Sequence, residues 1–174
     1  AIRIGALPDS DLVATRLAPL LRIACASPQY LQEHGHPASP EELLRHNCLT
    51  MSSTHSPTGW WSFASVNHGR ALAVRGRFRS DDTESLLEAA VAGLGVVHLA
   101  SWLVHEKVAS GQLVSLFPAV VSAATAAASM TRSQAPAIHA VRLKGRSHAA
   151  KAQLFIAHLK QAFGETPYWD KAFS

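Results

Sequence analysis

The sequence predicts an α/β protein in which helices pack in layers against a largely parallel sheet. Short apolar runs typical of strands alternate with amphipathic runs typical of helices along the chain, which is the order found in layered α/β folds. Of the 174 residues, 48% are hydrophobic and 16% are charged. The chain therefore has enough apolar material for a core, and its length suits one domain or two small lobes.

The first part of the chain predicts strands followed by a short helix. Residues 2–5 form a strand pattern, and the apolar run 17–26 fits either a buried strand or a short buried helix. The Ser-Pro pair at 27–28 is typical of a helix N-cap and a first helical position. A helix is therefore expected to continue to residue 34 and to end at Gly35.

A second Ser-Pro pair, at 39–40, predicts another helix start, with Glu42 at the position that completes a capping box. The alanine-rich segment 120–135 fits either a helix or a flexible excursion. Apolar patterns bounded by turn residues predict further strands at 48–51, 60–63, 71–78, 96–99, 113–117 and 138–143.

Three longer helices are predicted from apolar residues at helical spacing. The polar cluster 80–84 begins the first of them, and residues 101–108 form the second. Ser147 caps the last helix, and residues 165–174 follow it as a tail. The apolar face of this last helix consists of Ala152, Phe155, Ile156, Leu159 and Phe163.

Charge and cysteine content argue against several classes of protein. The formal net charge is +4, but the basic residues are scattered rather than gathered in a block, so no DNA-binding surface is predicted. No apolar run reaches the roughly 18 residues of a membrane helix, and the first residues lack the pattern of a signal peptide. These observations favour a cytoplasmic protein without a membrane partner, in which Cys25 and Cys48 are reduced, buried thiols.

No catalytic or metal-binding motif is found. His34, His36, His46 and Cys48 are close in sequence but lack the spacing of a zinc site, so surface histidines are expected. The sequence contains no nucleophile elbow, no Walker loop and no dinucleotide fingerprint. It therefore predicts neither an enzyme, nor a metal, nor a cofactor.

The order of segments resembles the effector-binding domain of LysR-type transcriptional regulators. The resemblance runs from residue 1 to about 118 and from about 137 to 163. The motifs that carry it are Ile2-Arg3-Ile4-Gly5, Pro8-Asp9-Ser10-Asp11-Leu12, Arg16-Leu17-Ala18-Pro19-Leu20, Cys25-Ala26-Ser27-Pro28, His46-Asn47-Cys48-Leu49, Trp61 with Phe63, Arg79-Ser80-Asp81-Asp82-Thr83, Ala90-Val91-Ala92-Gly93-Leu94-Gly95 and Gly111-Gln112-Leu113-Val114.

The resemblance implies a fold like that of type 2 periplasmic binding proteins: two α/β lobes joined by two crossover strands, with a ligand cleft between them. Residues 1–26 and 137–164 then correspond to an incomplete lobe I, and residues 27–136 to lobe II. The family's winged helix-turn-helix and the opening elements of its lobe I have no counterpart in this chain.

The candidate effector site centres on the cluster 80–84. Free N–H groups at a helix start, with hydroxyls beside them, can hold a carboxylate or another polar group, although the same cluster also fits a helix cap without a ligand. Asp81 and Asp82 disfavour a strongly anionic ligand. The residues that the resemblance implies for the site are Gly5, Ala6, Pro8, Ser27, Ser80, Asp82, Thr83, Leu99 and Ser101.

The resemblance further implies a sensor function. A small metabolite, a carboxylate or another polar compound, binds between the lobes and shifts their arrangement, and the shift is relayed to a DNA-binding domain outside this chain. The alternative is a solute-binding protein of a transporter. The unpaired sheet edges of an incomplete lobe I predict self-association into a dimer or larger assembly, and contact with DNA is expected only through the winged helix.

Overall fold

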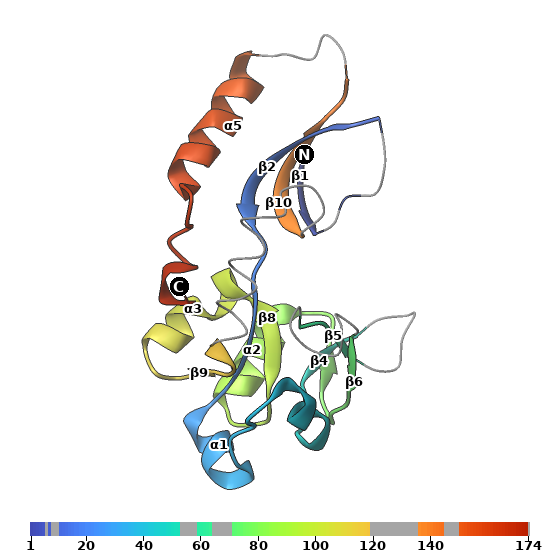
Figure 1. Ribbon diagram of the computed structural model, residues 1–174, viewed down its shortest axis with the longest axis vertical. Coiled ribbons are helices and arrows are strands. Elements are labelled where there is room, and N and C mark those ends of the chain that lie inside the picture. The colour runs from blue at the N-terminus through green and yellow to red at the C-terminus, as the bar shows by residue number, and fades with distance from the viewer. Residues whose placement is uncertain are drawn as a thin grey trace.

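The computed structural model describes residues 1–5, 7, 11–52, 59–63, 71–118, 136–144 and 150–173. The chain forms two bodies, each built around a sheet, with α5 beside the upper sheet in Figure 1 and the other α-helices around the lower one. In order, the elements are β1 (Ile2–Gly5), β2 (Val13–Pro19), β3 (Arg22–Ala26), α1 (Pro28–His34), η1 (Pro40–Arg45), β4 (Thr50–Met51), β5 (Gly59–Trp61), β6 (Leu72–Val74), β7 (Arg79–Ser80), α2 (Thr83–Val91), β8 (Val97–Ala100), α3 (Ser101–Ala109), β9 (Val114–Ser115), β10 (Ala137–Arg142), α5 (Ala150–Phe163) and η3 (Lys171–Phe173).

The first sheet consists of β1, β10 and β2, with β10 in the middle and both pairings antiparallel. Leu17, Ile138 and Ala140 are buried in its core. Helix α5 packs there through Ile156, Leu159 and Phe163. The apolar face predicted for this helix is therefore only partly used, because Phe155 and Ala152 remain exposed.

The chain passes from the first sheet to the second between β2 and β3. The Leu20 N–H donates to the carbonyl of Pro136 (3.2 Å), and the Leu21 carbonyl accepts from the N–H of Ser101 (3.0 Å). The apolar run 17–26 is therefore two strands joined by a short connection, and the alternative of a buried helix is wrong. Strand β3, which the sequence groups with lobe I, pairs with β8 and β9.

The second sheet brings β7, β4, β8, β3 and β9 side by side in this order. Strand β4 is parallel to β7, and a parallel bridge from Cys48 to Val96 connects its segment to that of β8. The pairings of β3 with β8 and β9 are antiparallel. The expectation of a largely parallel sheet is thus right for β4, β7 and β8. It is wrong for β3 and β10, which are antiparallel to both of their neighbours.

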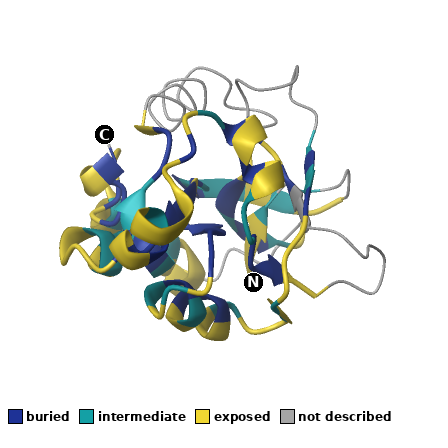
Figure 2. Cartoon of the chain, turned by 90° about the horizontal axis from the view of Figure 1, so that it is seen from below, coloured by how far each residue is buried: buried dark blue, intermediate teal, exposed yellow. Residues whose placement is uncertain are grey.

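Two apolar clusters cover the faces of the second sheet. Leu86 and Val104, from α2 and α3, pack with Ile23 on one face, whereas Tyr30 and Trp61 pack on the other. Buried segments lie inside, and the outer faces of the helices are exposed (Figure 2). Cys25 and Cys48 are free thiols with no exposed surface, as the sequence predicts, and burial raises the pKa of each to about 12.

Some elements are shorter than the sequence predicts. The strand expected over 71–78 ends at Val74, because Gly76 lies against the backbone of Cys48. The helix expected after Ser39 is a 3₁₀ helix, η1, whose start that side chain does not cap. Glu42 accepts instead from the N–H of Ala38 (2.8 Å), one residue before the position that a capping box requires.

Several sequence predictions fall outside the described residues. They include the conformation of segment 120–135 and the cap expected at Ser147. Within the part of the chain that the structure describes, no helix is long and apolar enough to cross a membrane.

Candidate functional site

Strands β4, β7 and β8 run in the same direction, so their carboxyl ends reach one edge of the second sheet. The turn 80–83 follows β7 at this edge, and α3 follows β8 directly. Loops at the carboxyl ends of parallel strands are where α/β sheets bind ligands. Ser80, Asp82, Thr83, Leu99 and Ser101, predicted from widely separated segments, are thus brought to one edge.

Asp82 is the N-cap of α2. Its carboxylate accepts hydrogen bonds from the N–H groups of Glu84 (3.3 Å) and Ser85 (2.8 Å) and from the Ser85 hydroxyl (2.5 Å). The two hydrogen bonds from Ser85, side chain first, are the main reason why the pKa of Asp82 lies below its usual value. The protein's own carboxylate therefore occupies the donors that the sequence analysis assigns to a ligand.

Thr83 is the first residue of α2, and its side chain is half-buried. The cap formed by Asp82 uses the N–H groups of the second and third helical residues and leaves that of Thr83 available. Ser80 shapes the turn, because its hydroxyl accepts from the N–H of Asp82 (3.1 Å). A ligand at this turn would therefore meet one N–H and one hydroxyl beside a carboxylate, which favours a polar group over a bare anion.

Leu99 and Ser101 lie at the junction of β8 and α3. The Leu99 side chain is in the core with Ile23, its partner on β3, so only its backbone faces the edge. Ser101 is fully buried, and its N–H donates to Leu21 in the connection between the sheets. Its hydroxyl makes no hydrogen bond of standard geometry, and its polar neighbour is Asp170.

Gly5 ends β1 on the first sheet, opposite Ala137 of β10, which in turn faces Pro19 of β2. Pro19 directly precedes the connection to the second sheet, so the end of β1 lies near this connection, two strands across. The φ angle of Gly5 is +117°, a conformation that disfavours a side chain. Ala6 and Pro8, predicted beside it, are outside the described residues.

Ser27 lies away from these residues. It follows β3, which runs antiparallel to β8, and it therefore stands at the opposite edge of the second sheet. Its hydroxyl caps α1 by accepting from the N–H of Tyr30 (3.2 Å), and it lies near Gly93, beyond the carboxyl end of α2. The chain crosses between the sheets upstream of Ser27, between β2 and β3.

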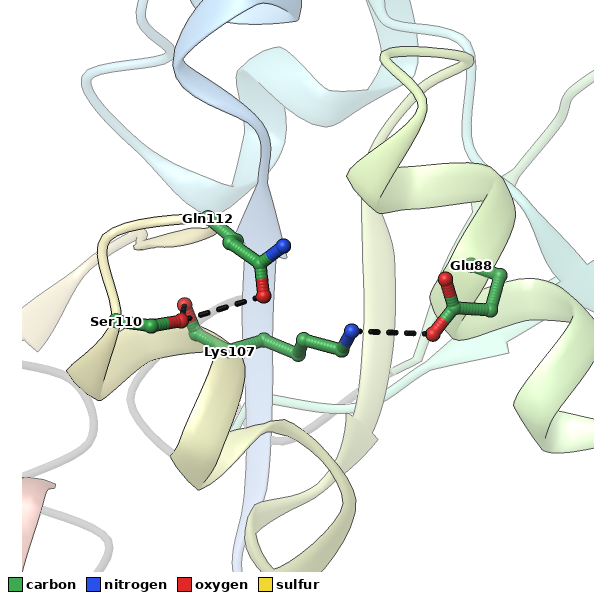
Figure 3. Close-up of polar contacts among 4 residues, drawn as sticks. All are labelled: Glu88, Lys107, Ser110 and Gln112. Carbon is green, nitrogen blue, oxygen red and sulfur yellow. Dashed lines mark hydrogen bonds and ion pairs between the residues drawn. The ribbon is translucent and has the colours of Figure 1, made fainter.

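An ion pair links α3 to α2, and a short polar cluster lies at the end of α3 (Figure 3). Lys107 Nζ lies 3.2 Å from Glu88 Oε1. At the end of α3, the Ser110 hydroxyl donates to the Lys107 carbonyl (3.2 Å) and lies 3.3 Å from Gln112 Oε1. The Lys107–Glu88 ion pair is thus a contact between the two helices that begin at the candidate site.

Arg22 is a charged residue of this region to which the sequence analysis assigns no role. It begins β3 directly after the connection, and its guanidinium donates to the His98 carbonyl (3.3 Å). Burial lowers the pKa of the arginine. Its position within an apolar run is the signal that could have pointed to it, since a charge seldom enters such a run without a reason.

The described residues offer little for metal or covalent chemistry. Within these ranges, no three His, Cys, Asp or Glu side chains come together as a metal site would require.

The family model for the LysR substrate binding domain matches residues 1–164. The chain belongs to this family. Two regulators of Escherichia coli are among its relatives. The HTH-type transcriptional regulator DmlR of strain K12 is 29% identical over 164 residues, which are 94% of this chain and 50% of that protein. The HTH-type transcriptional activator TtdR of strain UTI89 is 35% identical over 118 residues, 67% of this chain and 38% of that protein.

Solved structures of LysR-type regulators have the same fold. The regulatory domain of CrgA from Neisseria meningitidis superposes with a TM-score of 0.71 at 28% identity, covering 94% of this chain and 74% of that one. For the regulatory domain of AphB from Vibrio vulnificus, the TM-score is 0.63 at 25% identity, covering 91% and 72%. The fold is that of LysR regulatory domains, which resemble type 2 periplasmic binding proteins, and the chain spans half or less of these two E. coli regulators.

Proposed function

We propose that this LysR substrate-binding domain senses a small polar metabolite at the edge formed by the turn 80–83 and the β8–α3 junction, facing the end of β1. The observation that supports the proposal is that the turn 80–83 and the β8–α3 junction lie at the same edge of the second sheet, and that the junction is hydrogen-bonded to the connection between the sheets. We infer that a molecule bound at this edge also reaches the first sheet, so that its binding free energy depends on how the two bodies are placed.

The available donors indicate the ligand class. Thr83 supplies an N–H and a hydroxyl, and Gly5 supplies backbone groups from the first sheet. Asp82 already fills the remaining donors at the start of α2, and its charge repels a second anion placed beside it. We infer a ligand with hydroxyl or amide groups, in which any carboxylate lies away from this turn.

The signal passes to DNA through the rest of the regulator. A ligand that binds more tightly to one placement of the two sheets raises the population of that placement. The size of the shift is set by the difference between its binding free energies for the two placements. In the whole protein, this shift changes how a winged helix-turn-helix is presented to DNA. The domain acts in the cytoplasm, self-associates, and binds its effector without making or breaking a bond.

A transporter function is not favoured, because the relatives of this chain are transcriptional regulators. The test is a thermal-shift screen of polar metabolites on the parent regulator, followed by DNA binding with and without each hit. We expect at least one metabolite to raise the melting temperature and to change the DNA complex while being recovered unaltered. Chemical conversion of the hit, or stabilisation without any effect on DNA, would argue against a sensor.

A further inference from the structure

The segment that follows α5 is docked against the second sheet body. After Gly164 the chain turns, and residues 167–173 end in η3 beside α3 (Figure 1). Four residues of this segment are buried: Pro167, and Trp169, Asp170 and Phe173, which are 6%, 2% and 8% exposed. The family model ends at residue 164, so these contacts are made by residues beyond the region shared with the family.

Trp169 bridges the two bodies. Its ring packs edge to face against Phe163 of α5, with 5.1 Å between the ring centroids. It also meets Trp102 of α3, again edge to face, at 6.5 Å between the ring centroids. Helix α5 belongs to the first sheet and α3 to the second, so one buried side chain contacts both. Aromatic pairs of this geometry add to the free energy gained by burial.

Asp170 lies at the start of α3. The residue before this helix is Ala100, which has no side chain that could cap it. Asp170 lies beside Ser101, the first residue of α3, and burial raises the pKa of its carboxyl group. A carboxylate at a helix start is favourably placed to meet the N–H groups there. Asp170 is thus buried next to the first turn of α3.

Phe173 completes the contact by entering the core of the second sheet. It belongs to the cluster that contains Leu21 and Val104. Leu21 lies in the connection between the two sheets, so the core that Phe173 enters includes a residue of this connection. Tyr168 adds an outer contact with His105, at 5.5 Å between ring centroids.

We propose that residues 167–173 form an intramolecular clasp that fixes the placement of the two sheet bodies, with Trp169 as the bridge and Asp170 as the positioning residue for the start of α3. The clasp acts in the ligand-free chain, so it stands whether or not the proposed effector site is correct. Any rearrangement of the bodies must carry the clasp along or release it. Ser101 then serves to dock the clasp rather than to bind an effector through its hydroxyl.

The test measures the distance between the bodies by pulsed electron double resonance. Spin labels are attached at Arg3→Cys on β1 and Glu41→Cys on η1, both exposed positions. The native Cys25 and Cys48 have no exposed surface and escape labelling. The unmodified clasp should give one narrow distance distribution. Asp170→Ala and Phe173→Leu should shift it or add a second, broader population.

Glu165→Ala is the matched control, because it removes an exposed carboxylate from the same segment and should leave the distribution narrow. Melting curves establish that each variant is folded. A folded Asp170→Ala protein with an unchanged distribution would overturn the proposal. Hydrogen exchange on the unmodified chain needs no variant: residues 167–173 should be protected together with the start of α3, and exchange at the rate of an unstructured tail would equally overturn it.

Discussion

Ser27 and Ser39 stand in the same Ser-Pro context but make different contacts. The Ser27 hydroxyl accepts from the N–H of Tyr30 and is buried, whereas Ser39 makes no such bond. Ser27→Ala should lower the free energy of unfolding by about 1 kcal/mol, the usual cost of losing a helix cap. Ser39→Ala is the control and should cost much less. Urea unfolding of both variants checks this, and equal losses would mean that the cap does not contribute.

His98 is a buried histidine between two aromatic rings. Its ring stacks on Phe63, at 4.8 Å between centroids, and lies 5.4 Å from the ring of Trp61. Burial, together with the positive charge of Arg22, lowers the pKa of His98 to about 3. In the unfolded chain the imidazole binds a proton near pH 6.5. The neutral form therefore favours folding above that pH, and its contribution is lost as the pH falls from about 6.5 towards 3.

We therefore expect the free energy of unfolding to fall with acidification by up to about 1.4 kcal/mol per pH unit from this residue alone. Methionine has a similar volume and cannot gain a proton. His98→Met should therefore make the free energy of unfolding depend less on pH between roughly pH 6 and pH 4. His158→Met, on the exposed face of α5, is the control. Urea unfolding at several pH values measures the slopes; parallel slopes for all three proteins would refute the assignment.

At the scale of elements, two glycines let the Asn47–Cys48 segment lie between its neighbours. A Cβ on Gly76 would stand 2.0 Å from the carbonyl oxygen of Cys48, and one on Gly95 would stand 2.2 Å from that of Asn47. Neither backbone atom can move without breaking the sheet. Gly76→Ala and Gly95→Ala should each lower the free energy of unfolding by about 1–3 kcal/mol. Ala92→Ser adds one atom at an exposed position and is the control, which should keep the stability of the wild type. Wild-type stability of either glycine variant would contradict this packing.

Most elements could be predicted from local patterns, and their pairing could not. Caps and periodicity locate α1 and α3 within about a residue, and the start of α2 within the cluster 80–84, because these signals are local. The apolar run 17–26 gives no sign of its division at Leu20–Leu21, since that division depends on hydrogen bonds to Pro136 and Ser101, which are distant in sequence. The antiparallel pairings of β3 and β10 depend on contacts of the same kind.

The candidate site was predicted to a similar extent. A cap cluster at 80–84 is visible in the sequence, and the structure identifies Asp82 as the residue that fills it. The local sequence identifies Ser27 as a helix cap but does not show at which edge of the sheet it lies, because that depends on how β3 pairs with β8. Asp170 is not predicted from the sequence. The large apolar residues Trp169 and Phe173 on either side of it are the signal that the tail packs against the rest of the chain.

For the whole molecule, exposed apolar residues on the first sheet predict self-association. Ile2 and Ile4 of β1 are 47% and 60% exposed, and they pair with Ala140 and Ile138, which belong to the core. A second copy that covers this face would bury them. Light scattering should therefore give a mass above 18.6 kDa. Ile4→Lys should lower that mass, whereas Leu44→Lys, on η1 and 56% exposed, should not. A monomer at high concentration would contradict this expectation.

We expect a metabolite to bind at the start of α2, where Thr83 offers an N–H and a hydroxyl. Calorimetric titration of the parent regulator with its effector measures this, comparing Thr83→Val with Thr15→Val on β2, the same change away from the site. Thr83→Val keeps the shape of the side chain and removes one polar partner. We expect it to weaken binding by about 1–2 kcal/mol, with an unchanged melting temperature and with wild-type affinity for Thr15→Val. Equal affinities for both variants would show that Thr83 only begins a helix.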